Sequence, residues 1–191
     1  MKILHIDSCA LGDSTSSRQY TAAAVALLAG NADEADNAIV LYRDLAASPL
    51  SHISGPLLQV MSNRWNTAIP MNAELRAEAL LGASLLQEFM AADVAIIGAP
   101  MYNFSMPSTL KAWLDRLLHL YATTKHEQGS KPRVILLTSG CSNTGHANAN
   151  EQMSHHEAQL RAAFHSMGIE QLEITRSSTA AQMSEELKAA A

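Results

Sequence analysis

The residues with the most evident chemical potential lie in a loop at 98–107, GAPMYNFSMP, called the aromatic loop below. Tyr102 and Phe104 offer flat apolar surface, and the side-chain amide of Asn103 offers hydrogen-bond donors and an acceptor. A proline near each end restricts the backbone. The apolar run before it, residues 93–97, predicts a buried strand. Ligands of open parallel sheets bind outside the carboxyl ends of the strands, so we expect a ligand site here.

A second loop, residues 8–17, is called the first loop because it comes first in the chain. It leads into a predicted helix, whose leading backbone N–H groups and dipole favour negative charge. The hydroxyl donors at this end are Ser14, Thr15, Ser16 and Ser17, and Arg18 adds positive charge. The loop lacks the glycine patterns of P-loops and of dinucleotide-binding sites. Its composition favours a phosphate site, with an ordinary helix N-cap as the alternative.

Together the two loops suit the binding of a flavin phosphate. An isoalloxazine ring requires a stacking surface and hydrogen-bond donors for its N5 and carbonyl edge. Met101, Tyr102 and Phe104 can supply the surface, while Asn103 and backbone N–H groups can supply the donors. A third loop, residues 139–145, is made of small residues that let the backbone approach a ring closely. The alternatives are an aromatic loop packed into the core or a subunit interface, and an ordinary turn at the third loop.

The periodicity of apolar residues predicts the strands and helices that must position these loops. It predicts strands at about 2–7, 38–43, 93–98, 133–139 and 169–174, and helices at about 18–28, 74–90, 108–121, 151–167 and 180–189. Residues 44–71 contain three prolines and no sustained period, which predicts a long irregular excursion. The alternation predicts an α/β fold, a flavodoxin-like doubly wound five-stranded parallel sheet of order 2-1-3-4-5 with helices on both faces. In that order the three loops meet at one edge.

Composition narrows the class of protein. The chain has 191 residues, 48% hydrophobic and 16% charged, which suits one domain, residues 1–191, with a substantial core. Its net charge of -5 argues against nucleic acid as a partner. No apolar run is long enough to cross a membrane, and the first residues enter a strand pattern without a cleavage signal. We therefore expect a cytoplasmic protein.

The cysteines and histidines do not indicate a metal site. Cys9 and Cys141 are too few for a disulfide framework or a thiolate site, and the predicted strand order separates them by about 10 Å, beyond disulfide reach. We expect both to remain free thiols. Four histidines lie close together in the sequence, but adjacent ones point about 100° apart on a helix. We expect His146, His155, His156 and His165 to face solvent, and no metal.

At these residues the chain resembles the FMN-dependent azoreductases, also named NADH:quinone oxidoreductases. Residues 99–104, APMYNF, followed by PS at 107–108 and LK at 110–111, resemble the hallmark of that family. Residues 15–18, TSSR, are similar to its Ser-x-Ser phosphate loop, with Thr15 in place of the first serine. The similarity covers nearly the whole chain in order.

The resemblance implies tightly bound, non-covalent FMN, a homodimer with its active site at the interface, and NADH or NADPH as donor. It implies two-electron ping-pong transfer to quinones or azo compounds. The implied FMN contacts are Cys9, Thr15, Ser16, Ser17, Pro100, Met101, Tyr102, Asn103, Phe104, Ser139, Gly140, Cys141 and Ser142. No side chain has to act as acid or base, because the protein supplies position and electrostatics. Tyr102, Asn103 and His146 are candidate contacts to the substrate.

The chain departs from the family in three places. Gly140 and Cys141 stand where the family has arginine and glycine, and Cys9 stands where many members have serine. The segment 122–132 is several residues short and lacks the aromatic stretch that helps cover the flavin. We expect a wider, more polar pocket, covered mainly by Trp65 and its neighbours.

Other proteins of similar fold remain as alternatives. A non-enzymatic flavodoxin-type FMN electron carrier would show a semiquinone on reduction and little turnover with NADH. A small phosphatase would need an arginine six residues after its nucleophilic cysteine. Thr15 stands at that distance from Cys9, which argues against a phosphatase.

Overall fold

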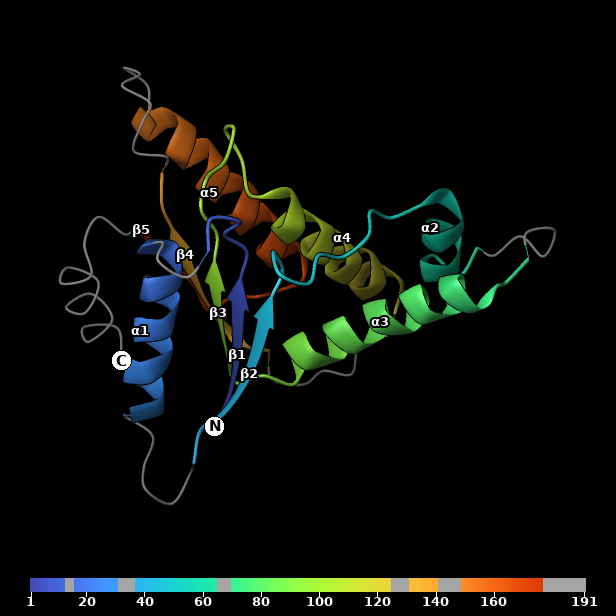
Figure 1. The fold of residues 1–191 in the computed structure, drawn as a ribbon, viewed down its shortest axis with the longest axis horizontal. Helices are drawn as coiled ribbons and strands as arrows, with labels where there is room; N and C mark the ends of the chain where they lie inside the picture. Colours follow the sequence, from blue (N-terminus) through green and yellow to red (C-terminus); the bar gives the residue numbers. More distant parts are fainter. Residues whose placement is uncertain (13–15, 31–36, 65–69, 125–130, 141–148, 177–191) are drawn as a thin grey trace.

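A computed structural model describes residues 1–12, 16–30, 37–64, 70–124, 131–140 and 149–176 of the chain (Figure 1). Five parallel strands form one sheet of order β2-β1-β3-β4-β5. The strands are β1 Lys2–Asp7, β2 Ile39–Asp44, β3 Val94–Gly98, β4 Arg133–Thr138 and β5 Leu172–Arg176. The helices are α1 Ser16–Gly30, α2 Gly55–Met61, α3 Ala73–Met90, α4 Ser108–Thr123 and α5 Ala149–Ser166. The predicted fold class and strand order are confirmed.

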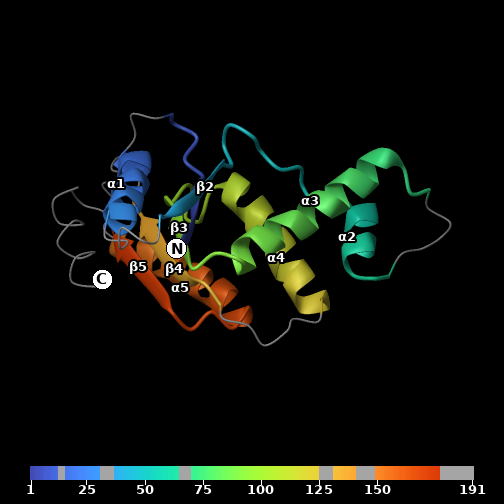
Figure 2. The same ribbon diagram turned by 90° about the horizontal axis from the view of Figure 1, so that it is seen from below.

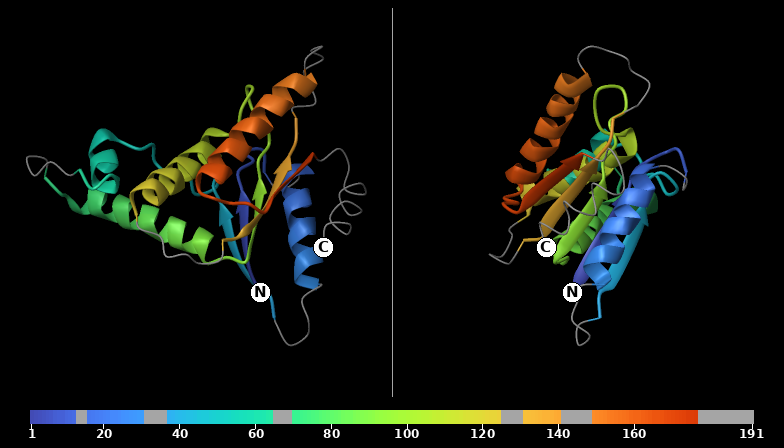
Figure 3. Two further views of the ribbon diagram at one scale, coloured as in Figure 1. Left: turned by 180° about the vertical axis from the view of Figure 1, so that it is seen from behind. Right: turned by 90° about the vertical axis from the view of Figure 1, so that its left-hand side faces the viewer.

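Side chains that alternate along the central strands build two hydrophobic layers, one on each face of the sheet. Ile3 of β1 packs with Tyr20, Ala24 and Leu28 of α1. Leu4 and its neighbours on the other face pack with residues of α3, α4 and α5. Figures 2 and 3 show α1 on one side of the sheet and α5 on the other. Burial on both faces explains why the central strands are almost continuously apolar.

Aromatic packing fixes the helices of the larger layer. The ring of Phe89 in α3 meets that of Trp113 in α4 edge-on, with centroids 5.8 Å apart. It also lies 6.0 Å from the ring of Phe164 in α5. Edge-to-face pairs add stability beyond the apolar area that they bury. Helix α4, which begins just after the aromatic loop, is therefore anchored in the core.

Two predicted elements differ from the structure. The excursion at 44–71 contains α2, which begins with Ser54 as N-cap and Pro56 in its first turn and buries Leu57. The fifth strand begins at Leu172 rather than Ile169, because Ile169 packs into the core after the turn at the end of α5. The predicted helix at 180–189 lies outside the described residues.

Over the described ranges, no helix combines the length and apolarity that crossing a membrane requires.

Candidate functional site

The aromatic loop and the described parts of the first and third loops, residues 8–12, 16–17 and 139–140, lie at the carboxyl edge of the sheet (Figure 1). The aromatic loop is hydrogen-bonded to each of the other two. The Ser8 hydroxyl in the first loop donates to the carbonyl of Gly98 at 2.6 Å. The N–H of Met101 in the aromatic loop donates to the carbonyl of Ser139 in the third loop at 2.8 Å. The aromatic loop is thus held on both sides, as expected for loops that share one site.

The aromatic loop contains a tight turn, from Tyr102 to Ser105, whose two central residues are exposed. The N–H and C=O groups of Tyr102 and Ser105 exchange hydrogen bonds of 2.6 and 2.9 Å. Between them, Asn103 and Phe104 have φ values of 43° and 69°. Positive φ is unusual for a large residue such as Phe104, costs about 1–3 kcal/mol and is concentrated at ligand sites. The Phe104 side chain is 65% exposed, which leaves its ring available as a stacking surface.

Tyr102 connects the aromatic loop to the first loop. Its hydroxyl lies 3.0 Å from the Cys9 sulfur and accepts a hydrogen bond from the N–H of Ala10 at 3.3 Å. Burial, with a further contribution from the Cys9 thiol, raises the pKa of Tyr102 to about 12. The phenol therefore stays protonated at neutral pH and remains able to donate a hydrogen bond.

Arg18 does not contribute its charge as the sequence suggested. The guanidinium turns back toward the end of β2, where NH1 donates to the Asp44 carboxylate at 2.6 Å and to the Tyr42 hydroxyl at 3.2 Å. Its NH2 donates to the Cys9 carbonyl at 3.0 Å. The expectation that Arg18 adds free positive charge at an anion site is wrong, because a carboxylate of this chain already neutralises it. Arg18 instead ties the first loop to β2.

Two buried or half-buried carboxylates support this end of the sheet. Asp7 accepts hydrogen bonds from the hydroxyls of Thr21 at 2.7 Å and Tyr42 at 3.0 Å. Burial alone would raise the pKa of Asp7, but contacts from His5, Thr21 and Tyr42 outweigh it, and the pKa is lowered. For Asp44, burial is likewise outweighed by hydrogen bonds from Arg18 and two backbone N–H groups, so its pKa is lowered. Both groups are charged at neutral pH.

The start of α1 fits a phosphate group in part. Ser16, the first residue of the helix, is exposed, and the first backbone N–H groups of a helix have no acceptor within it. Ser17 is buried, and a Cβ placed at Gly98 would lie 3.4 Å from its hydroxyl oxygen. Gly12 has a φ of 79°, and no atom lies within 4 Å of the Cβ position that it leaves empty. An exposed Ser16 at the start of a helix and an exposed Phe104 in the aromatic loop are compatible with the expected FMN.

Helix α5 contacts the aromatic loop, and one prediction made for this helix is wrong. His156 is completely buried rather than solvent-facing, and its Nε2 lies 2.9 Å from the carbonyl oxygen of Ala99. The Ser105 hydroxyl donates to the Gln159 side chain at 2.8 Å. His155 and His165 are exposed, as predicted. The described residues include no cluster of three or more potential metal-ligating side chains.

Several predicted site residues lie outside the described residues, namely Thr15, Trp65, Cys141, Ser142 and His146. Most of the short 122–132 segment does so as well. Cys9 is buried, and the expected separation of the two cysteines stays a prediction.

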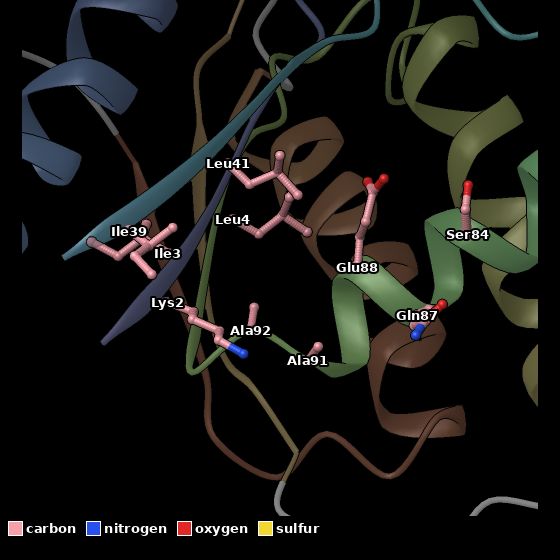
Figure 4. Close-up of a pocket in the computed structure, with 10 residues that line it drawn as sticks. All are labelled: Lys2, Ile3, Leu4, Ile39, Leu41, Ser84, Gln87, Glu88, Ala91 and Ala92. Carbon is pink, nitrogen blue, oxygen red and sulfur yellow. The ribbon is translucent and has the colours of Figure 1, made fainter.

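A cavity of about 450 Å³ lies elsewhere, between the start of β1 and β2 and the end of α3 (Figure 4). Its lining is mainly aliphatic, with Leu4 and Leu41 on the sheet side and Ala91 and Ala92 on the helix side. None of the predicted site residues lines it. The cavity is therefore separate from the three loops.

Comparison with known sequences agrees with the fold. The sequence model of one protein family, described as "Flavodoxin-like fold", matches residues 1–191. The FMN-dependent NADH:quinone oxidoreductase of Methylocella silvestris is 41% identical over 184 residues, covering 92% of this chain and 86% of the relative. The FMN-dependent NADH:quinone oxidoreductase 2 of Pseudomonas aeruginosa is 39% identical over 183 residues, with the same two coverages.

Comparison with solved structures also agrees with the fold. An FMN-dependent NADH-azoreductase of Bacillus anthracis, solved in complex with FMN, superposes with a TM-score of 0.73 at 16% identity, over 100% of this chain and 95% of that one. A second azoreductase structure from the same species gives a TM-score of 0.72 at 17% identity, over 98% and 91% of the two chains. At this level of identity the match concerns the fold alone.

Proposed function

This chain belongs to the FMN-dependent NADH:quinone oxidoreductases of flavodoxin-like fold, and from that membership we propose where it binds FMN and how it uses it. The enzyme class is established by the relatives, whose names specify both FMN and NADH. The proposed part is that the carboxyl-edge loops hold FMN, and that two electrons pass from the nicotinamide to a quinone or azo compound in ping-pong order.

One observation carries the placement of FMN. The aromatic loop is hydrogen-bonded to the first and third loops, and its turn holds Phe104 outward in a strained conformation. The exposed Phe104, a protonated Tyr102 phenol and the start of α1 with its exposed Ser16 thus lie at one edge of the sheet. This combination supplies a stacking surface, a hydrogen-bond donor and an anion site, which are the parts that a flavin phosphate requires.

FMN, when bound, supplies the hydride-transfer chemistry, and the residues of the chain bind and orient. Ser16 and the N–H groups at the start of α1 would hold the phosphate, with Thr15 and Ser17 beside them. The ring would lie against the aromatic loop and the third loop. The proposed contacts are Cys9, Thr15, Ser16, Ser17, Pro100, Met101, Tyr102, Asn103, Phe104, Ser139, Gly140, Cys141 and Ser142. Tyr102, Asn103 and His146 remain candidate contacts to the substrate.

A homodimer is part of the proposal. Leu58 of α2, Met71 just before α3, Leu80 of α3 and Phe104 of the aromatic loop are 43%, 37%, 66% and 65% exposed. A contiguous patch of exposed apolar side chains marks a surface that a partner covers, and we propose that these residues belong to such a patch. The expectation that residues of the 44–71 segment cover the partner's site stays a proposal, as do the single domain and the cytoplasmic location. A monomer mass from light scattering at micromolar concentration would count against the dimer.

We also propose that the pocket accepts bulky acceptors, because the 122–132 segment lacks the aromatic cover found in related sequences. Fused-ring naphthoquinones should then be used at least as well as small benzoquinones. Steady-state comparison of one quinone of each kind tests this, and a strong preference for the small quinone would contradict it.

The function itself is tested by steady-state kinetics on the FMN-loaded protein. With NADH and a naphthoquinone varied together, ping-pong transfer predicts parallel lines in double-reciprocal plots. Intersecting lines would require both substrates to be bound at once and would refute the order of transfer. Little turnover with NADH, together with a stable semiquinone, would favour the electron carrier instead.

A further inference from the structure

His156 helps to fix the backbone of Ala99, near the start of the aromatic loop. The Ala99 N–H donates to the carbonyl of Leu137 in β4 at 2.9 Å, and the Ala99 carbonyl lies 2.9 Å from Nε2 of His156 in α5. Pro100, the next residue, has no N–H of its own. The backbone of Ala99 is thus held on both sides, through its N–H and its carbonyl, at the start of the loop that is proposed to contact FMN.

Helix α5 touches the aromatic loop at a second point, near its other end. Gln159, one turn after His156, accepts the hydrogen bond from the Ser105 hydroxyl. Residues three apart lie on the same face of a helix, so one face of α5 contacts the aromatic loop near its start, at Ala99, and again at Ser105. The position of Met101 to Phe104 therefore depends on α5 as well as on the sheet.

The contact between His156 and the Ala99 carbonyl requires a particular tautomer of the imidazole. A carbonyl oxygen can only accept, so Nε2 must carry the hydrogen. His156 is completely buried, and its Nδ1 has no hydrogen-bond partner among the described residues. The neutral ring leaves a bare acceptor there, whereas the protonated ring would bury an N–H without a partner, which is costly.

The charged groups around His156 do not compensate for that cost. Glu157, its neighbour on α5, is paired with Arg176 of β5 at 2.5 Å and accepts a hydrogen bond from the Thr138 hydroxyl at 3.3 Å. Burial lowers the pKa of His156, against smaller opposing effects of the Ala99 carbonyl and Glu157. The neutral ring is therefore the stable form near neutral pH.

We propose that His156 is a positioning residue whose neutral imidazole holds the aromatic loop in its flavin-binding geometry and whose protonation releases it. This rests on the proposed function, because it assigns FMN to that loop. It predicts that affinity for FMN falls as the solution becomes acidic, since the ring must lose the Ala99 contact or bury an unpaired N–H.

The test measures FMN binding by quenching of FMN fluorescence on the full chain, between about pH 5 and pH 8, where histidine titrates. The phosphate of FMN itself titrates near pH 6, so wild type must be compared with a variant that lacks the imidazole. In His156→Gln the amide can still donate to the Ala99 carbonyl but does not titrate. His155→Leu is the control, because His155 is adjacent but exposed.

Wild type and His155→Leu should lose about tenfold more affinity than His156→Gln across this range, which corresponds to about 1.4 kcal/mol. His156→Gln should bind nearly as tightly as wild type at pH 8, and His156→Leu more weakly at every pH. Equal pH dependence of wild type and His156→Gln would overturn the inference, as would a loss of affinity that only follows loss of the circular dichroism signal. Absence of FMN binding by wild type at pH 8 would instead refute the proposed function.

Discussion

Replacing Asp44 with asparagine should destabilise the protein and loosen the first loop. The Asp44 carboxylate pairs with the largely buried guanidinium of Arg18 at 2.6 Å and also accepts the N–H groups of Ala46 and Ala47 at 2.8 and 2.9 Å. An asparagine that keeps the two backbone contacts through its oxygen must turn its NH₂ group toward Arg18. Two donors then face each other, and the buried cation loses its nearer counter-charge, keeping the Asp7 carboxylate at 3.9 Å.

The magnitude follows from the geometry. The side chains of Arg18 and Asp44 are 9% and 17% exposed, so solvent screens their interaction only in part. A hydrogen bond to a charged group contributes about 1.5–3 kcal/mol. The remaining Arg18 contacts with Asp7, Tyr42 and Cys9 moderate the loss, and we expect about 2 kcal/mol. At a urea dependence of about 2 kcal/mol per M, the unfolding midpoint should fall by about 1 M.

Urea unfolding of the FMN-free protein measures this, at several protein concentrations so that dissociation of a dimer is separated from unfolding. Asp115→Asn is the control, because Asp115 forms an exposed ion pair with Lys111 on α4 and should contribute about 0.5 kcal/mol at most. If Asp44→Asn lowers the free energy of unfolding no more than Asp115→Asn does, the buried ion pair of Arg18 and Asp44 does not exist in solution. Weaker FMN binding is expected alongside, because Arg18 also holds the Cys9 carbonyl.

The same variant has a defined pH dependence. The pKa of Asp44 is lowered in the folded protein from its ordinary value of 3.8. A carboxylate of this kind stabilises the fold above its unfolded pKa, and the contribution is lost as the pH falls through the folded pKa. The stability difference between wild type and Asp44→Asn should therefore be constant near neutral pH and shrink below about pH 4. A difference that grows in acid would contradict the assignment.

Three further predictions concern the core and the first loop. Glu78→Gln should lower the free energy of unfolding in urea by about 2 kcal/mol, because Arg116 is completely buried and pairs with Glu78 at 2.6 Å. Glu74→Gln, on the exposed part of α3, is the control and should have little effect. Equal losses for the two variants would contradict this prediction. A double-mutant cycle of Cys9→Ala and Tyr102→Phe, read out as FMN affinity, should show a coupling of about 1 kcal/mol, and strict additivity would mean that these two side chains do not interact in solution. Cys9 is 3% exposed, so a thiol reagent followed by peptide mass spectrometry should label it slowly in the native protein and rapidly in urea.

The fold was predictable because its signals are local and strong. The apolar runs of β1, β3 and β4 belong to strands buried on both faces, and the connections between parallel strands allow few orders. The meeting of the first, aromatic and third loops follows from that order alone. The start of β5 was misplaced by three residues because Ile169 is as apolar as a strand residue but packs after the helix end.

The residues that hold the site in place were harder to predict. Arg18 stands at a helix start, where a charge could serve a ligand, and its partner Asp44 lies 26 residues away in the chain, so only the tertiary structure reveals the pair. His156 did have a signal in the sequence. It falls three residues after Met153 and four before Leu160, both buried, which places it on the apolar face of α5.

The most direct test of the central claim is a stepwise titration under anaerobic conditions, followed by the flavin absorbance. The purified chain is first saturated with FMN, then reduced with NADH, and then mixed with a naphthoquinone. The account predicts that the bound flavin bleaches on addition of NADH and recovers on addition of quinone, and that Phe104→Ala binds FMN less tightly than wild type. A chain that does not retain FMN, or a bound flavin that NADH leaves oxidised, would contradict it.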